Sequence, residues 1–307
     1  MTDTPVTVLF LAGIGRSGTT LLERALAGAP GVTALGEVMH LWDRGLVRGE
    51  LCGCGTPFLS CPFWQRIGDA AFGGWDNVDT ARLAHLKARV DRASRVPAVA
   101  AGRPSALARE VDEYVDHYVR LYRAATAETG DVLVDSSKQV SLAWCLQRRE
   151  DVDLRVVHCV RDSRGVAHSW SKEVRRPEAV AEQYGRMPRY SARAVSSLWL
   201  VHNLEIEALR RRVPVLRLRY EDFIREPMRT TRAVLGHAGI PAELDHVGTN
   251  TIRLGPTHSC AGNPMRFRSG EVELVADEAW RTRSHLGQRR LVTAMTAPML
   301  ARYRYPL

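Results

Sequence analysis

The sequence predicts an α/β fold with three layers, in which helices flank a central parallel sheet. Two observations lead to this prediction. Short apolar segments rich in β-branched residues alternate with longer segments of helical periodicity along most of the 307 residues. A glycine-rich turn follows the first apolar segment, residues 6–11, and leads directly into a helical pattern. Because each helix crosses over the sheet between two strands, such alternation gives parallel strands with helices on both faces.

The expected elements follow in order along the chain. Strands are expected at 6–11, 32–35, 132–134, 154–160 and 213–218, where apolar runs end in glycine or polar residues. Helices are expected from the first turn to about residue 26, in most of 78–129, at about 140–149 and at 191–212. Loops are expected at 102–104 and 174–190, and the last third of the chain is expected to consist of helices and loops.

The composition is that of a globular protein with a basic balance. There are 43 Lys and Arg against 34 Asp and Glu, a net charge of +9, but no basic run with interleaved aromatic residues. We therefore expect a polyanionic ligand rather than nucleic acid. The chain has no apolar run long enough to span a membrane, and residues 1–5 lack the features of a secretion signal. A cytoplasmic protein is the expectation.

The turn after the first strand has the residues of an oxyanion site. Gly13 and Gly18 have the spacing of the two glycines of a P-loop, so a P-loop-like fold is expected. Thr19 stands where nucleotide triphosphatases have their phosphate-binding lysine, and the cation of this loop is Arg16. Backbone N–H groups at a helix start, together with Arg16, favour an anion bound without magnesium. The alternative is a tight turn without a ligand.

Polar residues follow the ends of all the expected strands. They are Arg16, Glu37, Lys138, Arg161 and Tyr220. In open parallel sheets, ligands bind outside the carboxyl ends of the strands. These side chains, remote from one another in sequence, are therefore expected to converge on one crevice.

The first loop resembles that of a known enzyme family. The run Gly15, Arg16, Ser17, Gly18, Thr19 and Thr20 is similar to the 5′-phosphosulfate loop of sulfotransferases that use 3′-phosphoadenosine 5′-phosphosulfate (PAPS). The arginine form resembles the bacterial, carbohydrate and tyrosylprotein enzymes. The resemblance implies that these six residues bind PAPS and that Arg16 neutralises charge on the bridging oxygen.

A second pair of residues resembles the 3′-phosphate signature of the same family. Arg161 and Ser169 are eight residues apart, across a strand end and the following helix. An arginine fork and a helix hydroxyl suit a phosphate group. The alternative is a solvated salt-bridge cluster of Arg161 with Asp162 and Arg164.

Two further segments extend the resemblance over nearly the whole chain. Residues 215–223 are similar to the family's strand that ends in Tyr-Glu-Asp, which implies that Tyr220 lies near the nucleotide. Residues 262–268 are similar to the loop that closes over the 3′-phosphate. Either Arg266 or Arg268 would then contact that phosphate, and the sequence does not separate them.

The candidate catalytic residues are Glu37, Arg16 and Lys138. Lys138 resembles the family's second cation, at the end of the third strand. The cytosolic small-molecule enzymes have a histidine base two residues later, and Val140 stands there in this chain. Glu37 is similar to the glutamate base of the tyrosylprotein and some carbohydrate enzymes. His40 is the rival base, and a surface or capping role is the alternative for Glu37.

The resemblance implies in-line transfer of a sulfuryl group from PAPS to a hydroxyl or amine, releasing the bisphosphate PAP without a metal. The acceptor would be a small molecule, natural product or carbohydrate. We expect a single domain over 1–307, with insertions at about 38–130 and 174–190 shaping the acceptor pocket. A P-loop-like kinase and a non-catalytic nucleotide-binding protein are the alternatives. The sequence is compatible with a homodimer and does not decide the oligomeric state.

Three of the six cysteines lie close together in the chain. Cys52, Cys54 and Cys61 are spaced C-x-C-x6-C, which is not a standard zinc pattern. The alternatives are zinc with a fourth ligand such as His40, a disulfide, and a loop of small buried thiols, and the sequence favours the last. The sequence therefore predicts no metal site.

Overall fold

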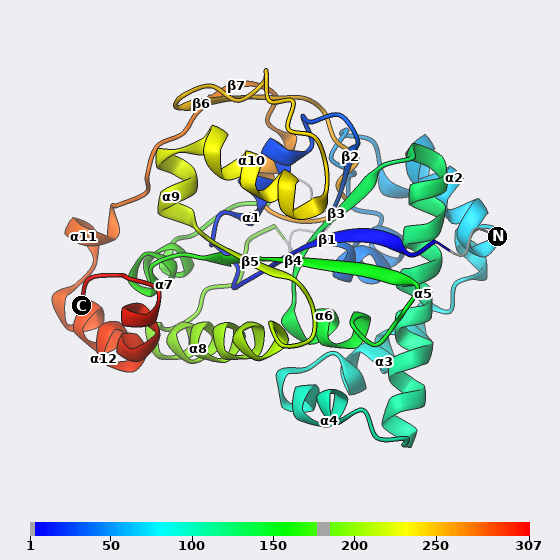
Figure 1. Ribbon diagram of the computed structural model, residues 1–307, viewed down its shortest axis with the longest axis horizontal. Coiled ribbons are helices and arrows are strands. Elements are labelled where there is room, and N and C mark those ends of the chain that lie inside the picture. The colour runs from blue at the N-terminus through cyan, green and yellow to red at the C-terminus, as the bar shows by residue number, and fades with distance from the viewer. Residues whose placement is uncertain (1–3, 177–184) are drawn as a thin grey trace.

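The computed structural model describes residues 4–176 and 185–307 (Figure 1). Its main sheet has five strands, all parallel, in the order β2-β3-β1-β4-β5. The strands are β1 (Val6–Ala12), β2 (Val32–Gly36), β3 (Val132–Lys138), β4 (Val152–Val160) and β5 (Val215–Arg219). The predicted α/β fold with a central parallel sheet is confirmed.

The helices lie mostly where helical periodicity predicted them. They are α1 (Thr19–Leu26), α2 (Pro62–Phe72), α3 (Thr80–Val90), α4 (Val96–Ala101), α5 (Ala106–Thr129), α6 (Val140–Leu146), α7 (Ser163–Ser171), α8 (Ala192–Leu209), α9 (Tyr220–Arg225), α10 (Pro227–Ala238), α11 (Trp280–Arg283) and α12 (Leu286–Arg302). The long helix α5 begins just after the predicted interruption, and Ser105 caps it by accepting a hydrogen bond from the N–H of Ala108.

The two faces of the sheet are buried by different sets of helices. Along β1, Val8 and Phe10 belong to a core shared with α2, α3, α5 and α6, whereas Leu9 and Leu11 pack with α1, α9 and α10. Successive strand residues point to opposite faces, so an unbroken apolar strand serves two cores. In Figure 1, α1, α9 and α10 lie above the sheet, and α6 and α8 lie below it. A third cluster joins α7, α8 and α12.

Two predictions about strands were wrong. The last third of the chain contains a two-stranded antiparallel ribbon, β6 (Thr251–Leu254) with β7 (Gly270–Glu273), although only helices and loops were expected there. Strand β3 also continues through polar residues as far as Lys138. The polar side chains are accommodated because they have buried partners: Tyr122 donates a hydrogen bond of 2.6 Å to Asp135, and Ser136 donates one of 2.7 Å to Glu23.

Membrane-spanning helices are absent from the part of the chain that the structure describes. None of the helices there has both the length and the apolar character that crossing a membrane requires.

Candidate active site

A cavity of about 300 Å³ opens at the carboxyl end of the sheet. Its walls come from the loop after β1, the ends of β2, β3 and β4, the helix α7, the start of α9 and the segment between β6 and β7. The lining residues are Gly15, Arg16, Gly18, Thr19, Thr20, Leu21, Glu37, Lys138, Arg161, Ser169, Trp170, Met187, Tyr220, Asn263, Met265 and Asp277. The strand ends predicted to converge therefore meet at one cavity, as expected for a parallel sheet.

Two aromatic rings hold the glycine-rich loop from either side. Gly18 is the N-cap of α1 with φ of +85°, and a Cβ there would lie 2.6 Å from the ring of Tyr220. A Cβ on Gly15 would lie 2.7 Å from Trp170, whose Nε1 donates a 3.0 Å hydrogen bond to the Gly15 carbonyl. Both positions require glycine, since no side chain fits between the loop and its neighbours.

Arg16 extends from this loop into the cavity and has few partners. Its guanidinium lies 5.1 Å from the ring centre of Trp170, and Nη2 is 3.1 Å from the sulfur of Met187. Its Nε and the hydroxyl of Ser17 are buried without a hydrogen-bond partner among the described residues. Burial lowers the pKa of Arg16, and Glu37 partly offsets that effect. Buried donors without acceptors are costly, so this arrangement suits an anion.

Glu37 and Lys138 form an ion pair at the ends of β2 and β3. Lys138 Nζ donates to Glu37 Oε1, and both side chains are only 13% exposed. Burial raises the pKa of Glu37, but the charges of Lys138 and the other neighbouring cations outweigh it and leave the pKa lowered. Glu37 therefore remains a carboxylate at neutral pH.

His40, the rival base, lies one turn beyond Glu37. Its Nε2 is 3.6 Å from Glu37 Oε2, so the imidazole belongs to the same cluster. Burial lowers the pKa of His40 to about 3. An imidazole with that pKa is neutral at pH 7 and accepts a proton only weakly.

Arg161 lies beside the first loop and already has an acidic partner. Its Nη1 donates a 3.0 Å hydrogen bond to the carbonyl of Arg16, and its Nη2 is 3.3 Å from Asp277 Oδ2. The guanidinium also lies 4.4 Å from the ring centre of Tyr220. The alternative from the sequence was a salt-bridge cluster of Arg161 with Asp162 and Arg164. In the structure Asp162 pairs with Arg164, at 2.7 Å, and Arg161 pairs with Asp277. Asp277 was not predicted, because it lies far away in the sequence, in a polar segment without a motif.

Most of the predicted site residues line the cavity, and three do not. Ser17 is 2% exposed and lies behind the loop surface. Arg266 is 1% exposed and donates hydrogen bonds of 2.8 and 2.7 Å to the carbonyls of Ser259 and Leu51. Arg268 is also absent from the walls. Asn263 and Met265 of the same segment take the place expected for an arginine.

Two buried charged residues of α1 were missed. Glu23 accepts hydrogen bonds of 2.8 Å from Gly36 N and 2.7 Å from the Ser136 hydroxyl, and burial raises its pKa to about 7. Arg24 donates to several backbone carbonyls of the segment after β6, those of Gly255, Met265, Arg266 and Arg268. Their position next to the apolar Leu22 and Ala25 is the signal that could have indicated burial.

Comparisons with known proteins agree with this fold. A family model for the sulfotransferase domain matches residues 54–254, a region that begins after the glycine-rich loop. The sulfotransferase domain from the Synechococcus PCC 7002 olefin synthase has a TM-score of 0.54 and 22% identity, covering 100% of this chain and 97% of that chain. The sulfotransferase domain from the curacin biosynthetic pathway has a TM-score of 0.50 and 15% identity, covering 100% of each chain. These two structures share the fold. No curated protein sequence matches the chain significantly.

Proposed function

The chain belongs to the sulfotransferase domain family, and on this premise we propose that it transfers a sulfuryl group from PAPS to an acceptor hydroxyl or amine. One observation carries the proposal. Arg16 of the glycine-rich loop, whose Nε is buried without a partner among the described residues, lines the same cavity as the ion pair of Glu37 and Lys138. An anion-binding loop beside a carboxylate and a second cation is what an in-line transfer between oxygen atoms requires.

The donor would be held at two points of the cavity. The loop from Gly15 to Thr20 offers backbone N–H groups, hydroxyls and the start of α1 to the phosphosulfate group. Arg161 and Ser169 line the neighbouring wall and would bind the 3′-phosphate. The fit is supported by Arg16, which lines the cavity and whose buried Nε has no acceptor among the described residues. Asp277 would compete with the 3′-phosphate, because its carboxylate already forms an ion pair with Arg161.

The residues of the cavity suit each change of charge in the transfer. As the acceptor oxygen bonds to sulfur, its proton would pass to the Glu37 carboxylate, and the bond from sulfur to the bridging oxygen would break to release PAP. Arg16 and Lys138 would stabilise the negative charge that develops on the sulfuryl group and the leaving phosphate. Glu37 is favoured over His40 as the base because Glu37 lines the cavity and His40 is not among its lining residues. No metal takes part in these steps.

The acceptor would be a small molecule, natural product or carbohydrate whose reacting group meets Glu37 in the cavity. We propose that the insertions at about 38–130 and 174–190 shape this part of the site within one domain. Of the second insertion, residues 177–184 lie outside those that the structure describes.

Titration of the protein with PAP in the presence of a chelator, followed by transfer assays with labelled PAPS, tests the proposal. We expect PAP to bind without magnesium and the label to move to members of a panel of alcohols, phenols, amines and sugars. Binding without transfer to any acceptor would instead indicate a nucleotide-binding protein. Transfer of phosphate from ATP with magnesium would indicate the kinase alternative.

A further inference from the structure

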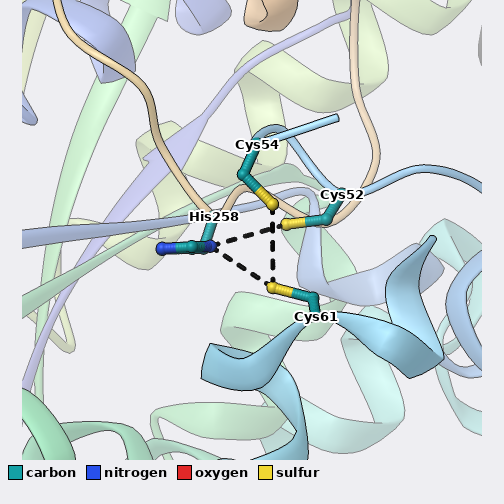
Figure 2. A group of neighbouring side chains, drawn as sticks. All are labelled: Cys52, Cys54, Cys61 and His258. Carbon is teal, nitrogen blue, oxygen red and sulfur yellow. Dashed lines mark hydrogen bonds between the residues drawn. The ribbon is translucent and has the colours of Figure 1, made fainter. Parts of the chain in front are cut away.

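Three cysteines and one histidine converge away from the cavity (Figure 2). Cys52 and Cys54 lie in a turn of the segment between β2 and α2, Cys61 is the N-cap of α2, and His258 follows β6. One potential ligand atom of each residue lies within 4.8 Å of those of the other three. The Sγ atoms of Cys54 and Cys61 are 3.8 Å apart, and His258 Nδ1 is 3.3 Å from Cys61 Sγ and 3.9 Å from Cys52 Sγ.

The three separations of 3.3–3.9 Å are close to those of a tetrahedral zinc site. Bond lengths of about 2.3 Å to sulfur and about 2.0–2.1 Å to nitrogen place neighbouring sulfurs about 3.8 Å apart and a sulfur and a nitrogen about 3.5 Å apart. We propose that Cys52, Cys54, Cys61 and His258 bind one structural zinc ion. The chain supplies all four ligands, as closed structural sites do, and the ion would displace the thiol protons to solvent.

The surroundings of the cluster fix the orientation of the ligands. The ring of His258 stacks on Phe63, with centroids 4.8 Å apart and 13° between the planes. Trp64 Nε1 donates a 2.8 Å hydrogen bond to the carbonyl of His258. Cys52 and Thr56 close the cysteine turn through a 2.8 Å backbone hydrogen bond. Supporting contacts of this kind hold metal ligands in place.

The other interpretations of the three cysteines fit the structure less well. His40, the fourth ligand of the zinc alternative, lies beside Glu37 and is not part of this cluster. All six cysteines are free, and a disulfide between any two would leave the third thiol and the imidazole without a role. Thiols that are merely buried do not have to converge on one point. Cys145 and Cys159 are buried and are not part of this cluster.

The ion would join two segments about 200 residues apart and support one wall of the cavity. The Gly53 N–H already donates a 2.9 Å hydrogen bond to the Ser259 carbonyl, and the Cys260 N–H donates one of 2.8 Å to Leu35 in β2. The same segment continues to Asn263 and Met265, which line the cavity. The proposed zinc therefore has a structural role that is separate from the chemistry of transfer.

Metal analysis of the full chain purified from zinc-supplemented cells tests the proposal directly. We expect about one zinc per chain after dialysis. X-ray absorption at the zinc edge should show three sulfurs and one nitrogen, and cobalt substitution should give the spectrum of a tetrahedral cobalt thiolate. Substoichiometric zinc, iron in its place, or a zinc shell of oxygen and nitrogen would overturn the proposal. None of these measurements depends on sulfuryl transfer or on a variant that folds.

Variants then identify the ligands. Cys61→Ala and His258→Ala should lose the stoichiometric zinc, and Cys54→His should keep it with an altered cobalt spectrum. Cys145→Ser, at a buried thiol outside the cluster, is the matched control and should keep both the zinc and the spectrum. Unchanged zinc content in folded Cys61→Ala would contradict the assignment. Should that variant fail to fold, chelation of the wild-type protein should increase hydrogen exchange at 52–61 and 257–266, and unchanged exchange would contradict the structural role.

Discussion

Lys138 Nζ donates a hydrogen bond to Glu37 Oε1, so one proposed catalytic cation and the proposed base form a single buried ion pair. The ion pair has two opposite effects on the proposed role of Glu37 as the base. It keeps Glu37 ionised and ready to accept a proton, but it also occupies an oxygen that an acceptor hydroxyl would approach. Because Lys138 would be drawn toward a bound phosphosulfate, binding of the donor would loosen the pair and expose the base.

The cation of the first loop is expected to contribute most to the rate. Arg16→Ala should lower sulfuryl transfer by about 10²–10³, because loss of one donor to a developing negative charge typically has that effect. Initial rates at saturating PAPS measure it. Arg229→Ala, a change of the same size at an exposed position outside the cavity wall, is the control and should remain close to wild type. Near-normal turnover in Arg16→Ala would remove this residue from catalysis.

The proposed 3′-phosphate site should act mainly on nucleotide affinity. Arg161→Ala and Ser169→Ala should weaken PAP binding, each by about tenfold or more, because each removes a direct donor to the phosphate. Calorimetry with PAP measures the change. Arg229→Ala removes an exposed charge far from the cavity and controls for net charge. Equal affinity in the wild type and both site variants would rule out their phosphate role.

Asp277 should oppose binding of the donor. Asp277→Asn should tighten PAP binding by several-fold, because its carboxylate pairs with Arg161 and repels an incoming phosphate. The gain should shrink at high salt, where charge interactions are screened. A weaker affinity in Asp277→Asn, measured in the same titration, would show that the carboxylate chiefly positions Arg161.

The base can be tested by separating binding from transfer. Glu37→Gln should fold and bind PAP, yet transfer sulfate to an aliphatic alcohol about 10²–10⁴ more slowly, because the amide cannot accept the proton. The loss should be smaller with a nitrophenol, whose hydroxyl is already acidic. Equal losses on both acceptors would indicate a positioning role. A fully active Glu37→Gln together with an inactive His40→Ala would make His40 the base.

Stability should depend on pH through Glu23. Its pKa is raised to about 7 by burial, from 4.5. Protonated Glu23 therefore makes a contribution to the free energy of unfolding that is fully present below pH 4.5. This contribution, on the order of 3 kcal/mol, is lost as the pH rises through about 7. Urea unfolding at pH 5 and pH 8 should show the decrease. Glu23→Gln should flatten it only in part, since the buried Asp135, with a pKa raised to about 6, acts in the same direction.

The parts of the site that follow strand ends could be predicted, because they depend on local patterns. An apolar run followed by glycines or a polar turn places Arg16, Glu37 and Lys138 without knowledge of their partners. Residues placed by tertiary contacts could not be predicted in this way. Asp277 reaches Arg161 across 116 positions, and Arg24 is buried because four carbonyls from a distant segment surround it.

Arg266 shows the converse case. Its motif suggested a phosphate ligand, but the chain folds its guanidinium inward onto backbone carbonyls. A sequence pattern names the residue type at a position and not the direction of the side chain. His258 was missed for the same reason, because only the folded chain brings it near three cysteines about 200 positions earlier.

The backbone at Arg16 and Lys138 has left-handed φ values of +76° and +66°, two of the four positive values at non-glycine residues in the part of the chain that the structure describes. Such a conformation costs about 1–3 kcal/mol at each residue, and glycine would avoid most of it. Glycine would also remove the two cations on which the proposed transfer depends. At these two positions, a substitution by glycine would therefore raise thermostability and lower turnover. An effort to evolve a more thermostable protein would do better to keep the strained backbone at Arg16 and Lys138 and to stabilise the surrounding fold.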